Sequence, residues 1–193
     1  MRYSREHKQQ THVRILDAAG KVFRERGFKG AGVDGIMEEA GLTPGGFYAH
    51  FASKEALLVE TLKHVLRQSS KQLLAGMEGK DKGEWLRAFV SRYLSREHCK
   101  AIPQGCAIPA LVSEIARSGK APRKAFEDIL REVIEALGRR MPEQAGPAET
   151  DRALAVLALC IGGVALARAV DSPTFADRIL RACREAALPA TSD

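Results

Sequence analysis

The sequence predicts an all-α protein. Apolar residues recur at spacings of three and four along the chain, and almost no segment alternates with the period of two that is typical of strands. With 193 residues, 45% of them hydrophobic, the chain is long enough to bury a core. We expect about nine helices, arranged as a three-helix module at the N-terminus followed by a larger helical body.

Three helices are predicted before residue 52. The first spans about residues 6–26 and ends at Gly27, and the second spans about residues 33–40 and ends at Gly41. The third is very short and ends near residue 49. Thr43 is placed to cap it with its hydroxyl, and Pro44 occupies the first turn, where its missing N–H costs nothing.

A longer helix is expected to link this module to the body. Ser53 is placed to cap it, and it reaches about residue 74, before a glycine-rich boundary. We therefore predict a first domain at residues 1–52 and a second at residues 53–193, joined through a helix at 53–75. The body helices are expected at about 84–96, 106–117, 122–140, 150–170 and 173–187.

One of the body helices is strongly apolar. Residues 153–167 contain no charged side chain, but this run is shorter than the ~20 residues that a membrane-spanning helix needs. We therefore expect a buried helix and no membrane partner.

Positive charge is concentrated at the N-terminal end. The formal net charge is +6, and residues 1–30 contain eight Lys and Arg residues against three Asp and Glu residues. Because basic surfaces attract phosphates, we expect this end to face a polyanion.

The second and third helices are joined at Ala40, Gly41 and Leu42 in the arrangement of a helix-turn-helix. The segment from Gly41 to Leu58 reads GLTPGGFYAHFASKEALL. Together with residues 23–28, this segment resembles the TetR family of bacterial regulators over about the first third of the chain. The resemblance implies a homodimer that binds a palindromic operator in double-stranded DNA, usually as a repressor that a small molecule releases.

The resemblance also implies which residues contact DNA. Hydroxyl, phenol, imidazole and ammonium groups would donate to phosphate oxygens. Gly45 and Gly46 stand where longer side chains are common, so we expect sparse direct readout of bases, supplemented by the N-terminal arm and by DNA shape. The predicted DNA contacts are Thr43, Pro44, Gly45, Tyr48, His50, Lys54, Arg2 and Arg5.

Two further sites are expected in the body. The resemblance implies an apolar pocket for a largely apolar effector, and its predicted lining is Trp85, Phe89, Tyr93, Cys106, Leu111, Phe126 and Leu130. The helix at 150–170 is apolar nearly all round and needs cover on more than one side, and Gly162 and Gly163 would admit a partner helix. The predicted dimer interface, formed by the last two helices, is Leu154, Leu157, Ile161, Val164, Ile179 and Cys183.

The cysteines leave an alternative function open. The four cysteines form no CxxC pair and no apolar signal segment follows Arg2, which indicates a reducing cytoplasm. Cys106 opens a predicted helix, and a thiol at such a position can be activated, so a sensor of oxidants or electrophiles is one alternative.

Two other classes of protein are alternatives to a regulator. An enzyme needs a nucleophile with its base, three metal ligands or a glycine-rich phosphate loop, and none stands at usable spacing. We therefore expect no catalytic residues, no metal and no cofactor. The second alternative is a helical scaffold that binds DNA without sequence preference. Such a protein would bind random duplexes and operator-like duplexes with equal affinity.

Overall fold

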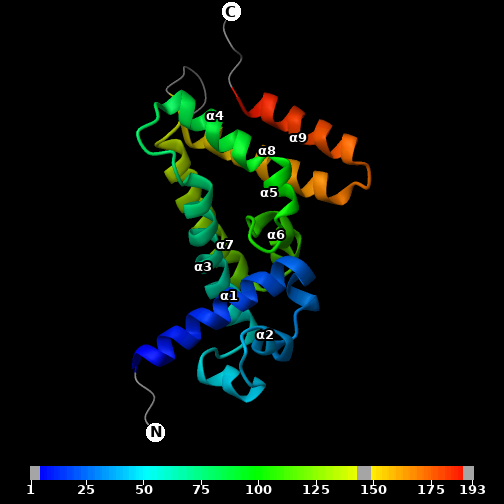
Figure 1. The fold of residues 1–193 in the computed structure, drawn as a ribbon. Helices are drawn as coiled ribbons and strands as arrows, with labels where there is room; N and C mark the ends of the chain where they lie inside the picture. Colours follow the sequence, from blue (N-terminus) through cyan, green and yellow to red (C-terminus); the bar gives the residue numbers. More distant parts are fainter. Residues whose placement is uncertain (1–4, 143–148, 189–193) are drawn as a thin grey trace, which may run out of the picture. The chain divides into compact units, whose positions relative to one another are not determined.

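The computed structural model describes residues 5–142 and 149–188, and within these ranges it contains helices and turns but no strand (Figure 1). The all-α prediction is confirmed. The described residues form ten helices: α1 (Arg5–Gly30), α2 (Val33–Glu39), the 3₁₀ helix η1 (Pro44–Ala49), α3 (Lys54–Leu74), α4 (Lys82–Tyr93), α5 (Arg96–Lys100), α6 (Ile108–Ala116), α7 (Lys120–Gly138), α8 (Glu149–Ala169) and α9 (Pro173–Ala187).

The chain divides into two compact units. Unit one comprises residues 1–69 and 106–127, and unit two comprises residues 70–105 and 128–193. Helices α3 and α7 each contribute residues to both units. The predicted domain boundary at residue 52 stays a prediction.

Unit one is built around α1, which packs against α2 and α6. The helix is interrupted where the sequence predicts its end, because Gly27 adopts φ 71° and ψ 171°, and one further turn follows to Gly30. Such a positive φ is strained for side chains other than glycine. The core of the unit includes Ile15, Ala19, Phe23, Ile36, Phe47, Leu57, Leu62 and Ile108.

Helix-capping predictions are partly confirmed. As predicted, the Ser53 hydroxyl accepts a hydrogen bond from the Ala56 N–H at 3.0 Å. The Ser172 hydroxyl also caps a helix, α9, by accepting from the Phe175 N–H at 3.3 Å. Thr43 stands at the N-cap position of η1, but its side chain makes no capping hydrogen bond. The prediction of a capping hydroxyl at Thr43 is therefore wrong, and this hydroxyl is not used by the helix that follows it.

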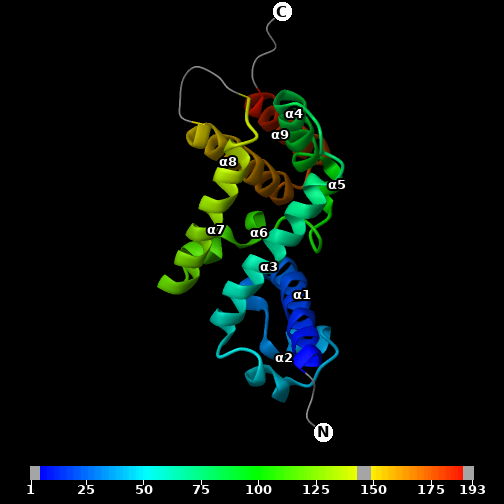
Figure 2. The same cartoon turned by 90° about the vertical axis from the view of Figure 1, so that its left-hand side faces the viewer.

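Unit two is organised around α8, which lies beside α9 and also contacts α4 and α5 (Figures 1 and 2). A stretch of 20 residues, Thr150–Ala169, is long and apolar enough to cross a membrane by length and composition alone. This stretch is longer than the uncharged run seen in the sequence. Core helices of soluble proteins pass the same criterion, so the finding is weak evidence for a membrane span.

The two adjacent glycines of α8 have different surroundings. A Cβ atom added at Gly163 would lie 2.8 Å from Leu94 Cδ2 and 3.1 Å from Cys183 Cβ, so this glycine allows close packing within the chain itself. A Cβ atom added at Gly162 would meet nothing within 4 Å. Of the two, only Gly162 leaves room for a partner helix.

This difference predicts opposite effects of alanine on stability. Both substitutions raise helix propensity by about 1 kcal/mol, but Gly163→Ala also overpacks a buried contact, which typically costs about 1–3 kcal/mol. We expect Gly163→Ala to unfold at lower denaturant concentration than Gly162→Ala, as measured by circular dichroism. Equal midpoints for the two variants would contradict the close approach at Gly163.

Candidate nucleic-acid interface

The 3₁₀ helix η1 is anchored by one aromatic ring and presents another to solvent. Phe47 is fully buried, whereas Tyr48 is 74% exposed. The two rings pack edge to face with centroids 5.1 Å apart, and Phe47 stacks on Phe51 at 5.8 Å. This packing fixes the backbone of η1 and leaves the phenol of Tyr48 outside.

The rest of the η1 surface carries little side-chain bulk. Thr43, Pro44 and Gly45 are exposed, and a Cβ atom added at Gly45 would meet nothing within 4 Å. A Cβ at Gly46 would instead touch the Met37 methyl group at 3.6 Å. The exposed backbone at Gly45 can therefore approach another molecule closely.

The turn between α2 and η1 is held by α1. The Arg14 guanidinium donates a hydrogen bond to the Ala40 carbonyl at 2.7 Å, at the end of α2. Gly41, with φ 66°, then makes the turn, and a Cβ there would lie 3.2 Å from the same guanidinium. Lys21 and Glu39 form an ion pair at 2.7 Å that joins α1 to α2. These contacts set the angle at which η1 leaves α2.

His50 follows η1 and is half-buried. Burial lowers the pKa of its imidazole from the usual value of 6.5, and the neighbouring His12 and Lys8 lower it further. The His12 ring lies 6.0 Å from the His50 ring, stacks on Phe51 and contacts a Glu60 carboxylate oxygen at 2.9 Å. The Nδ1 atom of His50 is buried and has no hydrogen-bond partner within the described structure.

Lys54, at the start of α3, contacts an aromatic ring of α1. Its ammonium nitrogen lies 4.4 Å from the centroid of Phe28. The backbone beside that ring is in turn held by α6, because the Glu114 carboxylate accepts hydrogen bonds from the Phe28 N–H at 2.6 Å and from the Lys29 N–H at 3.1 Å. We did not predict this role for Glu114, which is 86 residues away from Phe28 in sequence.

The remaining predicted DNA contact, the N-terminal arm, is only partly described. Arg5 is exposed at the first residue of α1, whereas Arg2 lies outside the described residues. The structure thus places Pro44, Gly45 and Tyr48 on η1, with Thr43 at its N-cap and His50 at its C-cap.

The predicted pocket residues divide between the two units. In unit two, Trp85 stacks on Phe89 with centroids 5.3 Å apart, and Phe89 contacts Tyr93 at 5.9 Å. All three rings are buried. Leu130 also belongs to unit two, whereas Cys106, Leu111 and Phe126 belong to unit one. Residues 5–142 and 149–188 contain no group of three His, Cys, Asp or Glu residues that could hold a metal ion.

The predicted dimer residues differ in exposure. Leu154 is 45% exposed, whereas Leu157 and Val164 are buried within the chain's own fold. Ile161, Ile179 and Cys183 are half-buried. Two large apolar side chains on α8 and α9, Leu166 and Phe175, are more exposed than any of the predicted residues. Helical periodicity does not single out Leu166, since α8 is apolar nearly all round.

Comparison with known proteins supports the helix-turn-helix. Residues 15–61 match the family model described as bacterial regulatory proteins, tetR family. The chain is 25% identical over 166 residues to the HTH-type transcriptional regulator LmrA of Bacillus subtilis strain 168, which covers 83% of this chain and 88% of that protein.

Two solved structures share the fold. A TetR-family transcriptional regulator from Cytophaga hutchinsonii superposes with a TM-score of 0.79 at 19% identity, covering 96% of this chain and 98% of that one. The regulator FadR from Bacillus subtilis, solved in complex with stearoyl-CoA, gives 0.70 at 18% identity, covering 93% and 99%. Together with the family match, these findings show that residues 15–61 form a domain of the tetR family of bacterial regulatory proteins and that the chain has the fold of TetR-family regulators.

Proposed function

We propose that this regulator is a cytoplasmic, homodimeric repressor that binds a palindromic operator through η1 and leaves it when a small molecule binds. The observation that carries the DNA-binding part is the exposed phenol of Tyr48 on a turn anchored by the buried Phe47. Donor groups on a rigid element hold their geometry better than donors on a mobile one.

The donors around η1 suit phosphate oxygens. Tyr48 and Thr43 are exposed, and the Thr43 hydroxyl is not used for capping. On DNA, Lys54 would exchange the Phe28 ring for a phosphate. A cation–π contact at an exposed site contributes about 0.5–1 kcal/mol, and a hydrogen bond between charged groups about 1.5–3 kcal/mol, so the exchange is favourable.

The bare surface at Gly45 supports close approach to the groove with few base contacts. A Cβ atom there would meet no neighbouring side chain within 4 Å, and a glycine cannot donate from a side chain. Specificity at this position would come from shape complementarity and from DNA deformability.

A homodimer is supported by the exposed apolar side chains of α8 and α9. Leu154, Leu166 and Phe175 are each 45% exposed or more, and a Cβ atom added at Gly162 of α8 would meet nothing within 4 Å. A pair of modules would read half-sites about 34–36 Å apart, which one module cannot do. Covering these side chains with a second copy would remove them from water.

An effector-responsive state is supported by the contact between α6 and α1. Glu114 fixes the backbone after the break at Gly27, close to Lys54, so a ligand that displaces α6 would also change the position of Phe28. The structural similarity to FadR, whose structure contains stearoyl-CoA, supports a small-molecule effector. The burial of Cys106, which is 5% exposed, gives the thiol-sensor alternative no support.

One prediction of this proposal concerns the phosphate contacts. In the Tyr48→Phe, Lys54→Gln double variant, loss of a phenol donor and an ammonium should weaken operator binding by about 2–4 kcal/mol, roughly 30- to 1,000-fold. The test is a gel shift across a salt series, with a duplex selected by the parent protein from random sequences. The negative slope of log affinity against log salt concentration should also become shallower by about one, because one lysine is lost.

The matched control is Lys63→Gln, which removes an exposed lysine from the same helix. It should bind the selected duplex like the parent. If the double variant retains the parent's affinity and salt slope, η1 and the start of α3 are not the DNA-binding surface.

The second prediction concerns pH. Without DNA, the pKa of His50 is held below 6.5, and a nearby phosphate would raise it by favouring the imidazolium. Binding would then take up a proton, so operator affinity should rise as pH falls through 6.5, by at most about tenfold per pH unit. The stability of the protein without DNA should change in the opposite direction. Because the pKa of His50 is lowered in the folded state, the free energy of unfolding falls as pH falls through 6.5.

Fluorescence anisotropy on labelled operator at several pH values measures this slope. His50→Gln should flatten it, whereas His64→Gln, which removes a histidine paired with Asp17, should leave it unchanged. The groups that face His50 are His12 and Lys8, and His12 in turn contacts Glu60. An identical pH slope in His50→Gln would show that this imidazole does not meet a phosphate.

A further inference from the structure

Unit two contains a cavity of about 270 Å³ that does not coincide with any predicted site. Of the residues predicted to line the effector pocket, it shares only Trp85. It lies where the loop after α3, the start of α4 and the end of α7 meet. Its wall carries four basic residues, an indole ring and a thioether. The residues on which the argument depends are Met77, Lys80, Lys82, Trp85, Arg139 and Arg140.

The loop that forms one wall is held in place from several sides. Arg92 of α4 donates hydrogen bonds to the Leu73 and Ala75 carbonyls, both at 2.8 Å. Met77 is 3% exposed and anchors the loop from within. At the other end of the loop, the Asp81 carboxylate caps α4 by accepting from the Glu84 N–H at 2.9 Å. The cavity wall is therefore pre-organised, which lowers the entropy lost when a ligand binds.

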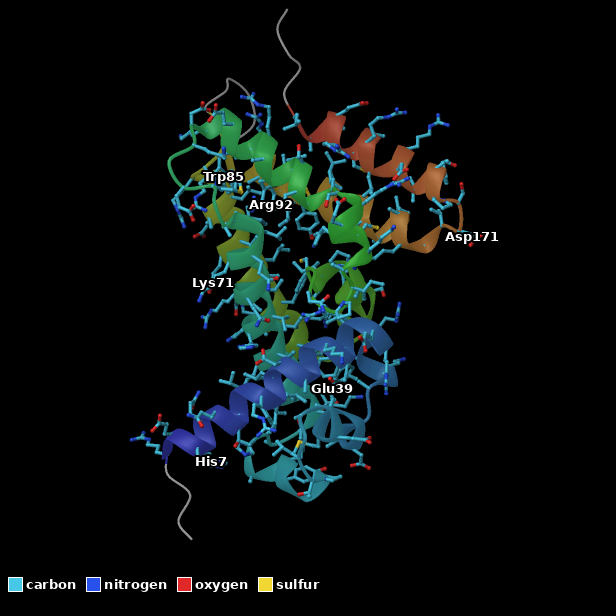
Figure 3. All side chains as sticks on the ribbon, in the orientation of Figure 1. His7, Glu39, Lys71, Trp85, Arg92 and Asp171 are labelled. Atoms are coloured by element: carbon cyan, nitrogen blue, oxygen red, sulfur yellow. The ribbon has the colours of Figure 1, made fainter. Side chains whose placement is uncertain are left out.

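The apolar side of the cavity is an aromatic stack. Trp85 and Arg92 both lie on α4 (Figure 3). Trp85 stacks on Phe89 with an interplanar angle of 6°, and the Arg140 guanidinium lies 5.4 Å from its ring. A guanidinium contacts a ring with its face and donates hydrogen bonds from its edge. Arg140 can therefore hold the indole and an anion at the same time.

The charge of the lining is strongly positive. The lining contains one acidic residue, Glu78, and four basic residues, and all five are exposed: the basic ones are Lys80, Lys82, Arg139 and Arg140. An anionic ligand in the cavity would offset the mutual repulsion of the four basic residues.

We propose that this cavity binds a small organic anion that carries an aromatic ring. The ring packs against Trp85 and Met77, and the anionic group is bound by Arg140 with the neighbouring lysines. The volume lies just below the range of about 300–1,000 Å³ typical of drug-sized ligands, which fits a single-ring molecule. The site is separate from η1, and its occupancy can be measured without DNA.

Tryptophan fluorescence gives a direct readout, because Trp85 is the only tryptophan in the chain. The full-length protein is titrated with 4-nitrobenzoate, a quenching aromatic anion, and in parallel with 4-nitrobenzyl alcohol, which has the same ring without the charge. We expect saturable quenching by the carboxylate and at least about tenfold weaker binding of the alcohol, a difference of about 1.4 kcal/mol. Added salt should weaken the binding of the carboxylate.

Variants identify the residues that bind the anion. Arg140→Gln and the Lys80→Gln, Lys82→Gln pair should each weaken 4-nitrobenzoate binding by about tenfold or more, as expected for losing a charged hydrogen bond. Lys71→Gln, on α3 outside the cavity, should bind like the parent (Figure 3). Quenching that does not saturate, that is equal for the two probes, or that survives in the basic-residue variants would overturn the proposal. None of these outcomes bears on operator binding.

Discussion

The burial of two phenylalanine rings holds η1, the proposed DNA-binding turn, on the rest of unit one. Phe47 and Phe51 are at most 2% exposed and stack on one another. A six-residue 3₁₀ helix that begins Pro-Gly-Gly has too few hydrogen bonds and too much backbone freedom to persist alone. Each buried ring contributes about 1.5–3 kcal/mol, so tertiary packing, rather than helix propensity, fixes the position of every donor on η1.

Helix α1 connects that turn to the rest of unit one. Near its middle Arg14 holds the end of α2, and after the break at Gly27 its backbone is held by Glu114 of α6. The two hydrogen bonds to Glu114 and the contact between Lys54 and Phe28 meet within two residues of α1. Under the proposed function, a change at α6 therefore reaches a phosphate-binding lysine through few intermediate contacts.

Local patterns in the sequence predict most of the helices. Glycines 27 and 41 take positive φ where the sequence predicts helix ends, and the hydroxyls of Ser53 and Ser172 cap the helices they precede. The five-residue helix α5 was missed, because fewer than two turns show no periodicity. Caps and turns are local, and a sequence reveals them well.

Long-range contacts were harder to predict. The role of Glu114 depends on residues 86 positions apart, and the basic cavity gathers side chains from the loop after α3, the start of α4 and the turn after α7. The motif resemblance predicted DNA-contact residues on and around η1, but it did not predict that the Lys54 ammonium would lie over Phe28. Spacing along the chain carries no information about such partners before the fold is known.

The central claim is that η1 enters the DNA groove with Tyr48 outermost, and photo-crosslinking tests it most directly. With p-benzoylphenylalanine in place of Tyr48, irradiation of the protein on its operator should yield a protein–DNA adduct. The same residue at Ile102, which is also exposed but lies in the turn after α5, should yield none. Crosslinking from position 102 but not from position 48 would contradict the account.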